Sequence, residues 1–174
     1  MIVVVFAHPY PARSRACARL LAAIRDLPAL AVRDLYQLYP DFDIDVAAEQ
    51  AALAGAQLVL WMHPVYWYTT PALLKHWFDR VLVKGWAHGP GGTALAGKRC
   101  LWVATTGGDE AAYSPEGRHR EPFRAYMPVV EQTARYCGME WLEPVILHGA
   151  HLVDDVALDA RGSALRQRLE AQTR

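Results

Sequence analysis

Short apolar runs alternate along the chain with longer segments in which apolar residues recur every three or four positions. The runs are rich in β-branched and aromatic residues and fall at 2–6, 31–35, 57–62, 99–104 and 141–147. Largely apolar runs of this length are typical of strands buried on both faces, as in a parallel sheet. The longer segments have the spacing of helices and fall at 15–26, 46–54, 71–83, 123–137 and 154–172.

Three residues mark helix ends. Ser14 stands where an N-cap would precede the helix at 15–26. Pro71 suits the first turn of the helix that follows it, and Gly138 suits the C′ position after the helix at 123–137. The segment 36–45 is rich in turn residues, so we expect it to be a connection.

Five strands alternate with five helices, which predicts an α/β fold. This order favours right-handed crossovers and a flavodoxin-like three-layer sandwich, with a five-stranded parallel sheet of order 2-1-3-4-5 in a single domain, 1–174. Ligands of such sheets bind outside the carboxyl ends of the strands, where the strand order reverses. The segments that follow strands one, three and four are therefore the candidate site.

Composition narrows the class of protein. The 174 residues include 18 Lys and Arg and 18 Asp and Glu, a balance that argues against a nucleic-acid partner. Cys17, Cys100 and Cys137 are widely spaced and form no CxxC motif, so we expect reduced thiols, without a disulfide framework or a metal site. The apolar stretch at the N-terminus is too short for a signal peptide or a membrane span, which favours a cytoplasmic protein.

The first candidate loop runs from His8 to Ser14. It contains neither GxGxxG nor GxxxxGK[ST]. The N-terminus of the next helix still offers free backbone N–H groups for an anion, and the Ser14 hydroxyl can donate to a phosphate or only cap the helix. Arg13 and Arg15 would neutralise a phosphate or lie on the surface, and His8 would bind a ligand or the backbone.

The second loop contains three adjacent aromatic residues, Tyr66, Trp67 and Tyr68, after Pro64 and Val65. Exposing so much aromatic area is unfavourable without a ligand or partner. A flat heteroaromatic ring packed on this loop would account for it. The alternatives are that the side chains fold inward or lie in a dimer interface.

The third loop is Thr105-Thr106-Gly107-Gly108. Paired glycines allow close approach of the backbone to a ligand, although a tight turn would use the same residues. Tyr113 and His119 follow in a loop that could cover the site. Each can donate a proton to a carbonyl oxygen that is being reduced, or be an ordinary loop residue.

These motifs together resemble the NAD(P)H quinone reductase family over nearly the whole chain. The residues that carry the resemblance are His8-Pro9 with Ser14; Pro64, Trp67-Tyr68, Pro71, Leu74-Lys75, Trp77 and Asp79; Gly85-Trp86-Ala87, Gly91-Gly92-Thr93-Ala94-Leu95 and Gly97-Lys98; and Thr105-Thr106-Gly107-Gly108. Within the family, the stretches 34–42 and 136–138 are similar to the ancillary flavoproteins of bacterial glutathione-gated potassium efflux systems.

The resemblance implies a homodimeric flavoprotein that transfers two electrons from NADH or NADPH to a quinone by a ping-pong reaction. The short chain favours FMN over FAD as the cofactor. The matching positions imply that the phosphate and ribityl chain are held by His8, Ser14, Arg15, Ala16 and Cys17, and the ring by Pro64, Val65, Tyr66, Trp67, Tyr68, Thr105, Thr106, Gly107 and Gly108. Tyr113 and His119 resemble a catalytic pair that assists flavin reduction in mammalian quinone reductases.

Two alternatives to the enzyme remain. The resemblance to the ancillary flavoproteins also implies a regulatory subunit that activates a potassium efflux transporter, held peripherally at the inner face of the membrane, with redox activity secondary. Trp86 and His88 would reach the flavin of the other subunit. A one-electron flavodoxin is the third possibility, but the chain lacks the acidic composition and the phosphate loop of a typical flavodoxin.

Overall fold

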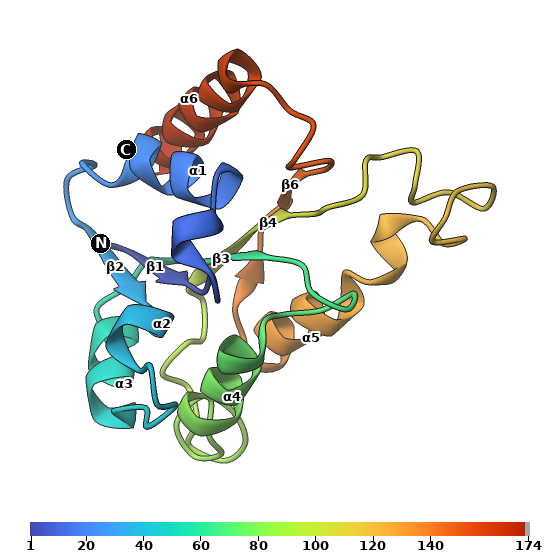
Figure 1. The fold of residues 1–174 in the computed structure, drawn as a ribbon. Helices are drawn as coiled ribbons and strands as arrows, with labels where there is room; N and C mark the ends of the chain where they lie inside the picture. The colour runs from blue at the N-terminus through green and yellow to red at the C-terminus, as the bar shows by residue number, and fades with distance from the viewer. Residues whose placement is uncertain (173–174) are drawn as a thin grey trace.

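The computed structural model describes residues 1–172 and contains one sheet with helices on both faces (Figure 1). The strands are β1 (Ile2–Phe6), β2 (Leu30–Asp34), β3 (Leu58–Pro64), β4 (Arg99–Thr105), β5 (Glu140–Trp141) and β6 (Val145–Leu147). The helices are α1 (Ala16–Ile24), α2 (Leu35–Leu38), α3 (Val46–Ala54), α4 (Ala72–Val81), α5 (Pro128–Tyr136) and α6 (Asp155–Gln172), with 3₁₀ turns η1 (Pro11–Arg13) and η2 (Phe123–Ala125).

The sheet has the order β2-β1-β3-β4-β5, as predicted, and its paired strands are parallel. The flavodoxin-like fold is thereby confirmed. β1, β3 and β4 are neighbours, so the loops that follow them meet at one edge of the sheet. Each of β1 and β3 is buried along its whole length, which explains why both read as continuous apolar runs.

Three predictions of element extent are wrong. The strand predicted at 141–147 is divided into β5 and β6, both paired with β4, because Pro144 lies between them and has no N–H for the ladder. The helix predicted at 123–137 begins as η2, and α5 starts only at Pro128, a favourable first helical residue. The connection 36–45 contains most of the short helix α2, which Asp34 caps by accepting a hydrogen bond from Gln37 N.

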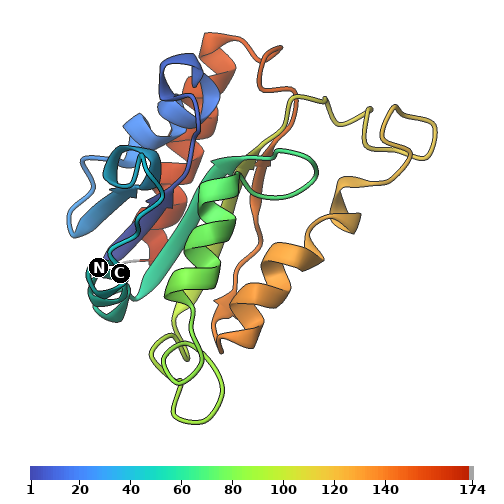
Figure 2. The same cartoon turned by 60° about the horizontal axis from the view of Figure 1, so that its bottom comes forward.

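Two apolar clusters fill the space between the sheet and its helices. α1 and α6 cover one face, and α3, α4 and α5 cover the other (Figures 1 and 2). Trp61, Trp77 and Trp102 are fully buried in the second cluster, which lies between the sheet and α3, α4 and α5. Gly138 ends α5 with φ 73°, as its predicted C′ role requires.

The long segment after β4 projects away from the sheet beyond α5 before the chain returns through η2 (Figures 1 and 2). It carries Tyr113 and His119. Tyr113 packs against the second apolar cluster, so the base of this segment is anchored although its tip is exposed.

Candidate functional site

A pocket of about 480 Å³ lies at the carboxyl edge of the sheet, where the three candidate loops meet. Its lining includes ten of the predicted site residues: His8, Ser14, Arg15, Ala16, Cys17, Pro64, Val65, Tyr66, Thr105 and Gly107. The other lining residues are Tyr10, Arg13, Ala150 and His151. The structure thus brings the first loop, the second loop and the third loop to one cavity, as the strand order predicts.

The start of α1 forms one end of the pocket. Among the described residues, no hydrogen bond is formed by the backbone N–H groups of Arg15, Ala16 and Cys17. Ser14 lies one position before the N-cap residue, Arg15, and its Oγ accepts a hydrogen bond from Ala18 N at 3.0 Å. Ser14 therefore caps the helix from the residue before the N-cap, and not from the N-cap position that the sequence predicts. The unpaired N–H groups are free to donate to an anion.

The guanidinium of Arg15 does not point at these unpaired N–H groups. It donates to Val153 O at 2.6 Å and to Asp155 Oδ1 at 2.6 and 3.2 Å. Arg15 thus ties α1 to the start of α6. Arg13, in η1, also lines the pocket, and its guanidinium forms no ion pair among the described residues.

His8 and Cys17 form the inner part of the pocket. His8 Nδ1 accepts a hydrogen bond from Tyr10 N at 3.1 Å, so a neutral ring carries its proton on Nε2. Burial lowers the pKa of His8, and the nearby Asp34 offsets part of this shift. Cys17 Sγ lies 3.2 Å from Thr105 Oγ1, and burial raises the pKa of the thiol to about 11. Cys17 is therefore a protonated packing residue that joins α1 to the end of β4.

The second loop is a two-residue turn between Tyr66 and Thr69, which exchange backbone hydrogen bonds of 3.1 and 3.0 Å. The central residues, Trp67 and Tyr68, have φ values of 49° and 63°. Such turns normally use Asn and Gly, because side chains with a bulky Cβ substituent are strained at positive φ. Strain of this kind is concentrated at functional sites.

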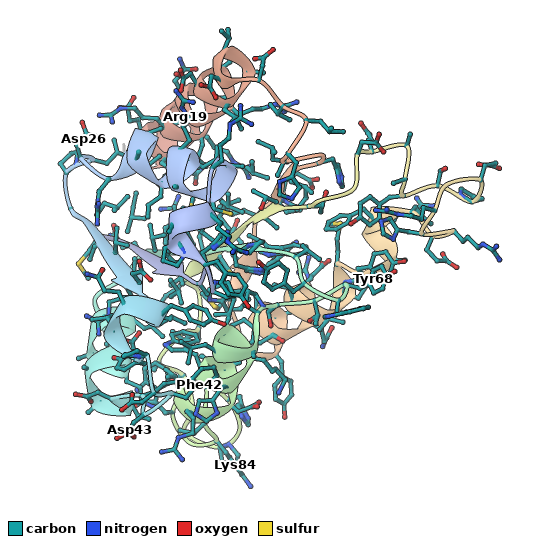
Figure 3. All side chains as sticks on the ribbon, in the orientation of Figure 1. Arg19, Asp26, Phe42, Asp43, Tyr68 and Lys84 are labelled. Carbon is teal, nitrogen blue, oxygen red and sulfur yellow. The ribbon has the colours of Figure 1, made fainter. Side chains whose placement is uncertain are left out.

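The aromatic side chains of this turn are exposed, as predicted. Trp67 is 91% exposed and does not line the pocket, while Tyr68 lies at the tip of the connection, near the start of α5 (Figure 3). Tyr68 stacks on Tyr126 at 4.8 Å between ring centroids. The N–H groups of Trp67 and Tyr68 donate no hydrogen bond among the described residues, so they are available to a ligand.

The two glycines of the third loop serve different neighbours. Gly107 is exposed and lines the pocket, and a side chain there would meet His151 only at 3.9 Å. Gly108 is buried, and a Cβ there would lie 2.9 Å from His119 Nε2 and 3.2 Å from Tyr113. Gly107 therefore leaves room for a ligand, whereas Gly108 leaves room for the loop that carries Tyr113 and His119.

Tyr113 and His119 are brought together outside the pocket. Their rings stack at 4.3 Å, and the Tyr68 hydroxyl lies 3.3 Å from His119 Nδ1. His119 Nε2 is buried without a hydrogen-bond partner, and burial raises the pKa of Tyr113. The pair thus stands between the aromatic turn and Gly108.

A buried histidine fixes the base of the second loop. His63 Nδ1 lies 2.9 Å from Pro64 O and Nε2 accepts a hydrogen bond from Trp102 Nε1 at 2.8 Å, so the ring is neutral with its proton on Nδ1. Burial lowers the pKa of His63 to about 4. The following N–H, of Val65, donates to Thr105 O at 2.8 Å, which leaves this peptide no free group for a ligand.

Sequence reasoning did not select Tyr10, Ala150 or His151. Ala150 and His151 follow β6, whose residue Leu147 pairs with Thr105. The signal was available in principle, since the segment after the last strand ends at the same edge of the sheet. No helix among residues 1–172 combines the length and the apolar character that a membrane crossing needs.

Residues 1–172 match the flavodoxin-like fold family. The "Glutathione-regulated potassium-efflux system ancillary protein KefF" of Citrobacter koseri is 48% identical over 98% of this chain and 96% of its own. The structure of general stress protein 14 from Treponema denticola in complex with FMN has a TM-score of 0.90 and 30% identity, and covers 98% of both chains. An NADPH-quinone reductase from P. pentosaceus has a TM-score of 0.86 and 27% identity, and covers 97% of this chain and 96% of its own.

Proposed function

This chain belongs to the flavodoxin-like fold family and is a relative of the potassium-efflux ancillary proteins, and from this premise we propose that it is an FMN-dependent NAD(P)H:quinone oxidoreductase. One observation carries the proposal: a single pocket is lined by the unpaired N-terminus of α1, by Tyr66 at the start of the aromatic turn, and by Gly107, whose N–H is unpaired among the described residues. An FMN molecule requires an anion site at one end and a flat, hydrogen-bonding surface at the other. The FMN complex of the Treponema protein supports this cofactor.

The start of α1 would hold the phosphate and the ribityl chain. The N–H groups of Ala16 and Cys17 and the Ser14 hydroxyl can donate to phosphate oxygens, and Arg13 supplies a positive charge. His8 carries its proton on Nε2 when neutral, so it can donate to a ribityl or phosphate oxygen.

The ring would lie between the aromatic turn and Gly107. FMN, when bound, supplies the hydride chemistry. The chain orients the ring through the N–H groups of Trp67, Tyr68 and Gly107, and Tyr113 and His119 would provide the proton that a quinone oxygen needs. Because NAD(P)H and the quinone would use the same exposed face in turn, we expect ping-pong kinetics.

The test begins with the purified protein, which should be yellow and should release FMN on denaturation. Steady-state oxidation of NADH and NADPH with a benzoquinone should give parallel double-reciprocal lines. Ser14→Ala should weaken FMN binding by about tenfold or more, because it removes a hydrogen bond to a charged group. Ser163→Ala, on an exposed position of α6, is the matched control and should leave FMN binding unchanged. A protein that stays colourless and binds no added FMN contradicts the proposal.

The likeness to the ancillary protein KefF favours a second candidate function, regulation of a potassium efflux transporter. In this case the protein would be cytoplasmic and held at the membrane by the transporter. Co-purification of the tagged protein with a potassium efflux membrane protein tests this role. If the tagged protein does not co-purify with detergent-free membranes that contain the transporter, the regulatory role is contradicted. The two functions are compatible, because the FMN pocket leaves most of the surface free.

We also propose a homodimer that uses the groove between α4 and α5. The groove has a volume of about 560 Å³, and its lining includes Phe78, Val129 and Tyr136, of which Val129 is 60% and Tyr136 65% exposed. His88 lies against Tyr136, with 4.9 Å between ring centroids, at one side of this groove. Light scattering after gel filtration should give twice the mass of the chain, and Val129→Asp should reduce it to one.

A further inference from the structure

The loop Thr105–Gly108 is held from behind by the segment that follows β6. Thr106 N donates to Leu147 O at 3.0 Å, Ala150 N donates to Thr106 O at 2.8 Å, and Gly149 N donates to Gly108 O at 2.8 Å. The backbone of this loop is therefore fixed on its inner side. Among the described residues, the N–H groups of Gly107 and Gly108 form no hydrogen bond.

The Thr106 hydroxyl connects this loop to a histidine that the FMN pocket does not include. Thr106 Oγ1 donates to Gly108 O at 2.7 Å and lies 3.0 Å from His148 Nδ1. A hydroxyl has one proton, and here Gly108 O receives it. His148 must therefore donate to Thr106 Oγ1, which places a proton on His148 Nδ1.

This chain of donors sets the orientation of the glycine peptides. Gly108 O accepts two hydrogen bonds, from Gly149 N and from the Thr106 hydroxyl, and both donors lie on the inner side of the loop. Gly108 O belongs to the peptide that joins Gly108 to Asp109, and Thr106 O, which accepts from Ala150 N, belongs to the peptide that carries the Gly107 N–H. The peptide between the two glycines therefore lies between two fixed peptides, and Gly107 lines the pocket. The Tyr113 side chain also hydrogen-bonds Thr106, and the donation from His148 Nδ1 to Thr106 Oγ1 leaves the hydroxyl proton pointing to Gly108 O.

His148 is itself held in place, away from the pocket. Its ring lies 5.3 Å from the Tyr113 ring and 5.0 Å from the Phe123 ring. It lines a separate cavity of about 740 Å³ between η2, β6 and α6, together with Glu110, Glu143 and Arg161. His148 thus joins the glycine loop on one side to the Tyr113 segment on the other, without lining the FMN pocket.

We propose that His148 is a positioning residue of the flavin site, which acts through Thr106 to aim the Gly107 and Gly108 N–H groups at the ring edge where negative charge gathers on reduction. This inference rests on the proposed function, since it assumes FMN in the pocket. Preorganised N–H donors stabilise a developing charge more than they stabilise the neutral group before reaction. His148 should therefore favour the reduced cofactor over the oxidised one.

The decisive measurement is the two-electron potential of the bound FMN, with the dissociation constant of oxidised FMN beside it. His148→Ala should reduce the preference for reduced over oxidised FMN about tenfold, which corresponds to a potential about 30 mV lower. His148→Asn should restore most of the potential, since the Asn side-chain nitrogen stands at the same branch position as Nδ1 and donates. His148→Gln, whose nitrogen is one carbon further out, should not restore it.

The matched control is His76→Asn, on α4, where the ring contacts Phe42 outside the flavin site. Its potential should equal that of the wild type. Thr106→Val should lower the potential like His148→Ala, while Thr106→Ser, which keeps the hydroxyl, should not. Wild-type potentials in both His148→Ala and Thr106→Val overturn the proposal. A potential that falls as far in His148→Asn as in His148→Ala also overturns it.

A second measurement needs no cofactor. Long-range ¹⁵N correlation spectra of the apoprotein should show His148 with its proton on Nδ1, and Thr106→Val should change the His148 shifts. A His148 protonated only on Nε2 overturns the proposal even if FMN binds. Failure of the protein to bind FMN, with the Nδ1 proton present, would instead refute the proposed function and leave the His148–Thr106 geometry standing.

Discussion

The turn at Trp67 and Tyr68 should cost stability, and replacing Trp67 by Asn should recover part of this cost. Trp67 has φ 49° and is 91% exposed. A left-handed backbone costs an ordinary side chain about 1–2 kcal/mol, and Asn tolerates it much better. The buried part of the indole is worth only about 0.5 kcal/mol, at roughly 25 cal/mol per Å² of a side chain that buries up to ~250 Å². The net expectation is that Trp67→Asn stabilises the protein by about 1 kcal/mol.

The assay is thermal unfolding of the FMN-free protein, because bound FMN would add its own stabilisation by mass action. For a chain of this size, about 1 kcal/mol corresponds to a rise in Tm of about 2–4 °C. The same variant should bind FMN up to about tenfold more weakly, since a stacking contact worth about 0.5–1.5 kcal/mol is lost. Tyr10→Asn is the control for stability, because Tyr10 is also an exposed aromatic but has φ −128°.

A Trp67→Asn apoprotein with an unchanged or lower Tm would refute the reasoning. It would mean that the positive φ is not a strain that Asn relieves. A higher Tm with unchanged FMN affinity would keep the strain and refute the contact between the turn and the ring.

The remaining predictions concern stability. Glu49→Gln should lower the free energy of unfolding, measured in urea, by about 3 kcal/mol. The buried Glu49 carboxylate accepts hydrogen bonds from the Arg33 guanidinium, and the substitution would leave that cation beside a neutral group. A loss below about 1 kcal/mol would contradict this. The pKa of His63 is lowered from 6.5 to about 4 in the folded protein, so the unfolded chain binds the proton more readily. The free energy of unfolding should therefore be highest above pH 6.5 and should fall by roughly 3 kcal/mol as the pH falls to about 4. His63→Phe should flatten that part of the pH profile, and an unaltered slope would assign it to other groups. Gly138→Ala should lower Tm, because φ is 73° and the new Cβ would lie 3.3 Å from Ala96; an unchanged Tm would show that the turn adapts without cost.

The sequence was sufficient for the layers and the strand order because buried parallel strands leave a direct trace, an apolar run without alternation. The apolar pattern did not predict the division between β5 and β6, although Pro144 lies within the run. Edge strands often tolerate a proline. Its effect depends on whether its nitrogen, which carries no hydrogen, faces the neighbouring strand or the solvent. That alignment is set by the pairing with β4, which the local pattern does not contain.

The lining of the pocket was predicted unevenly for a related reason. Ten of the residues selected after β1, β3 and β4 line it, since each lies near the end of its own strand. His148 and His151 were not selected, because their proximity to Thr106 and Gly107 comes from the pairing of Leu147 with Thr105, some forty residues away in the chain. The positive φ values of Trp67 and Tyr68 were also out of reach, since local preference assigns such positions to Gly and Asn.

The two walls of the proposed ring site, the turn at Trp67 and the glycine loop, differ in how firmly the fold holds them. Hydrogen bonds with Leu147, Gly149 and Ala150 fix Thr106 and Gly108. The turn at Trp67 is fixed by the pairing of its flanking residues and by the contacts of Tyr68 with Tyr126 and His119. The strained residues lie in the second wall, where few contacts oppose a change of conformation. Since a ligand can shift a segment only by interacting differently with its two conformations, the strained wall is the part of the site that a ring could remodel at low cost. The glycine wall, which aims the N–H donors, would keep its geometry through reduction and reoxidation, as electrostatic preorganisation requires.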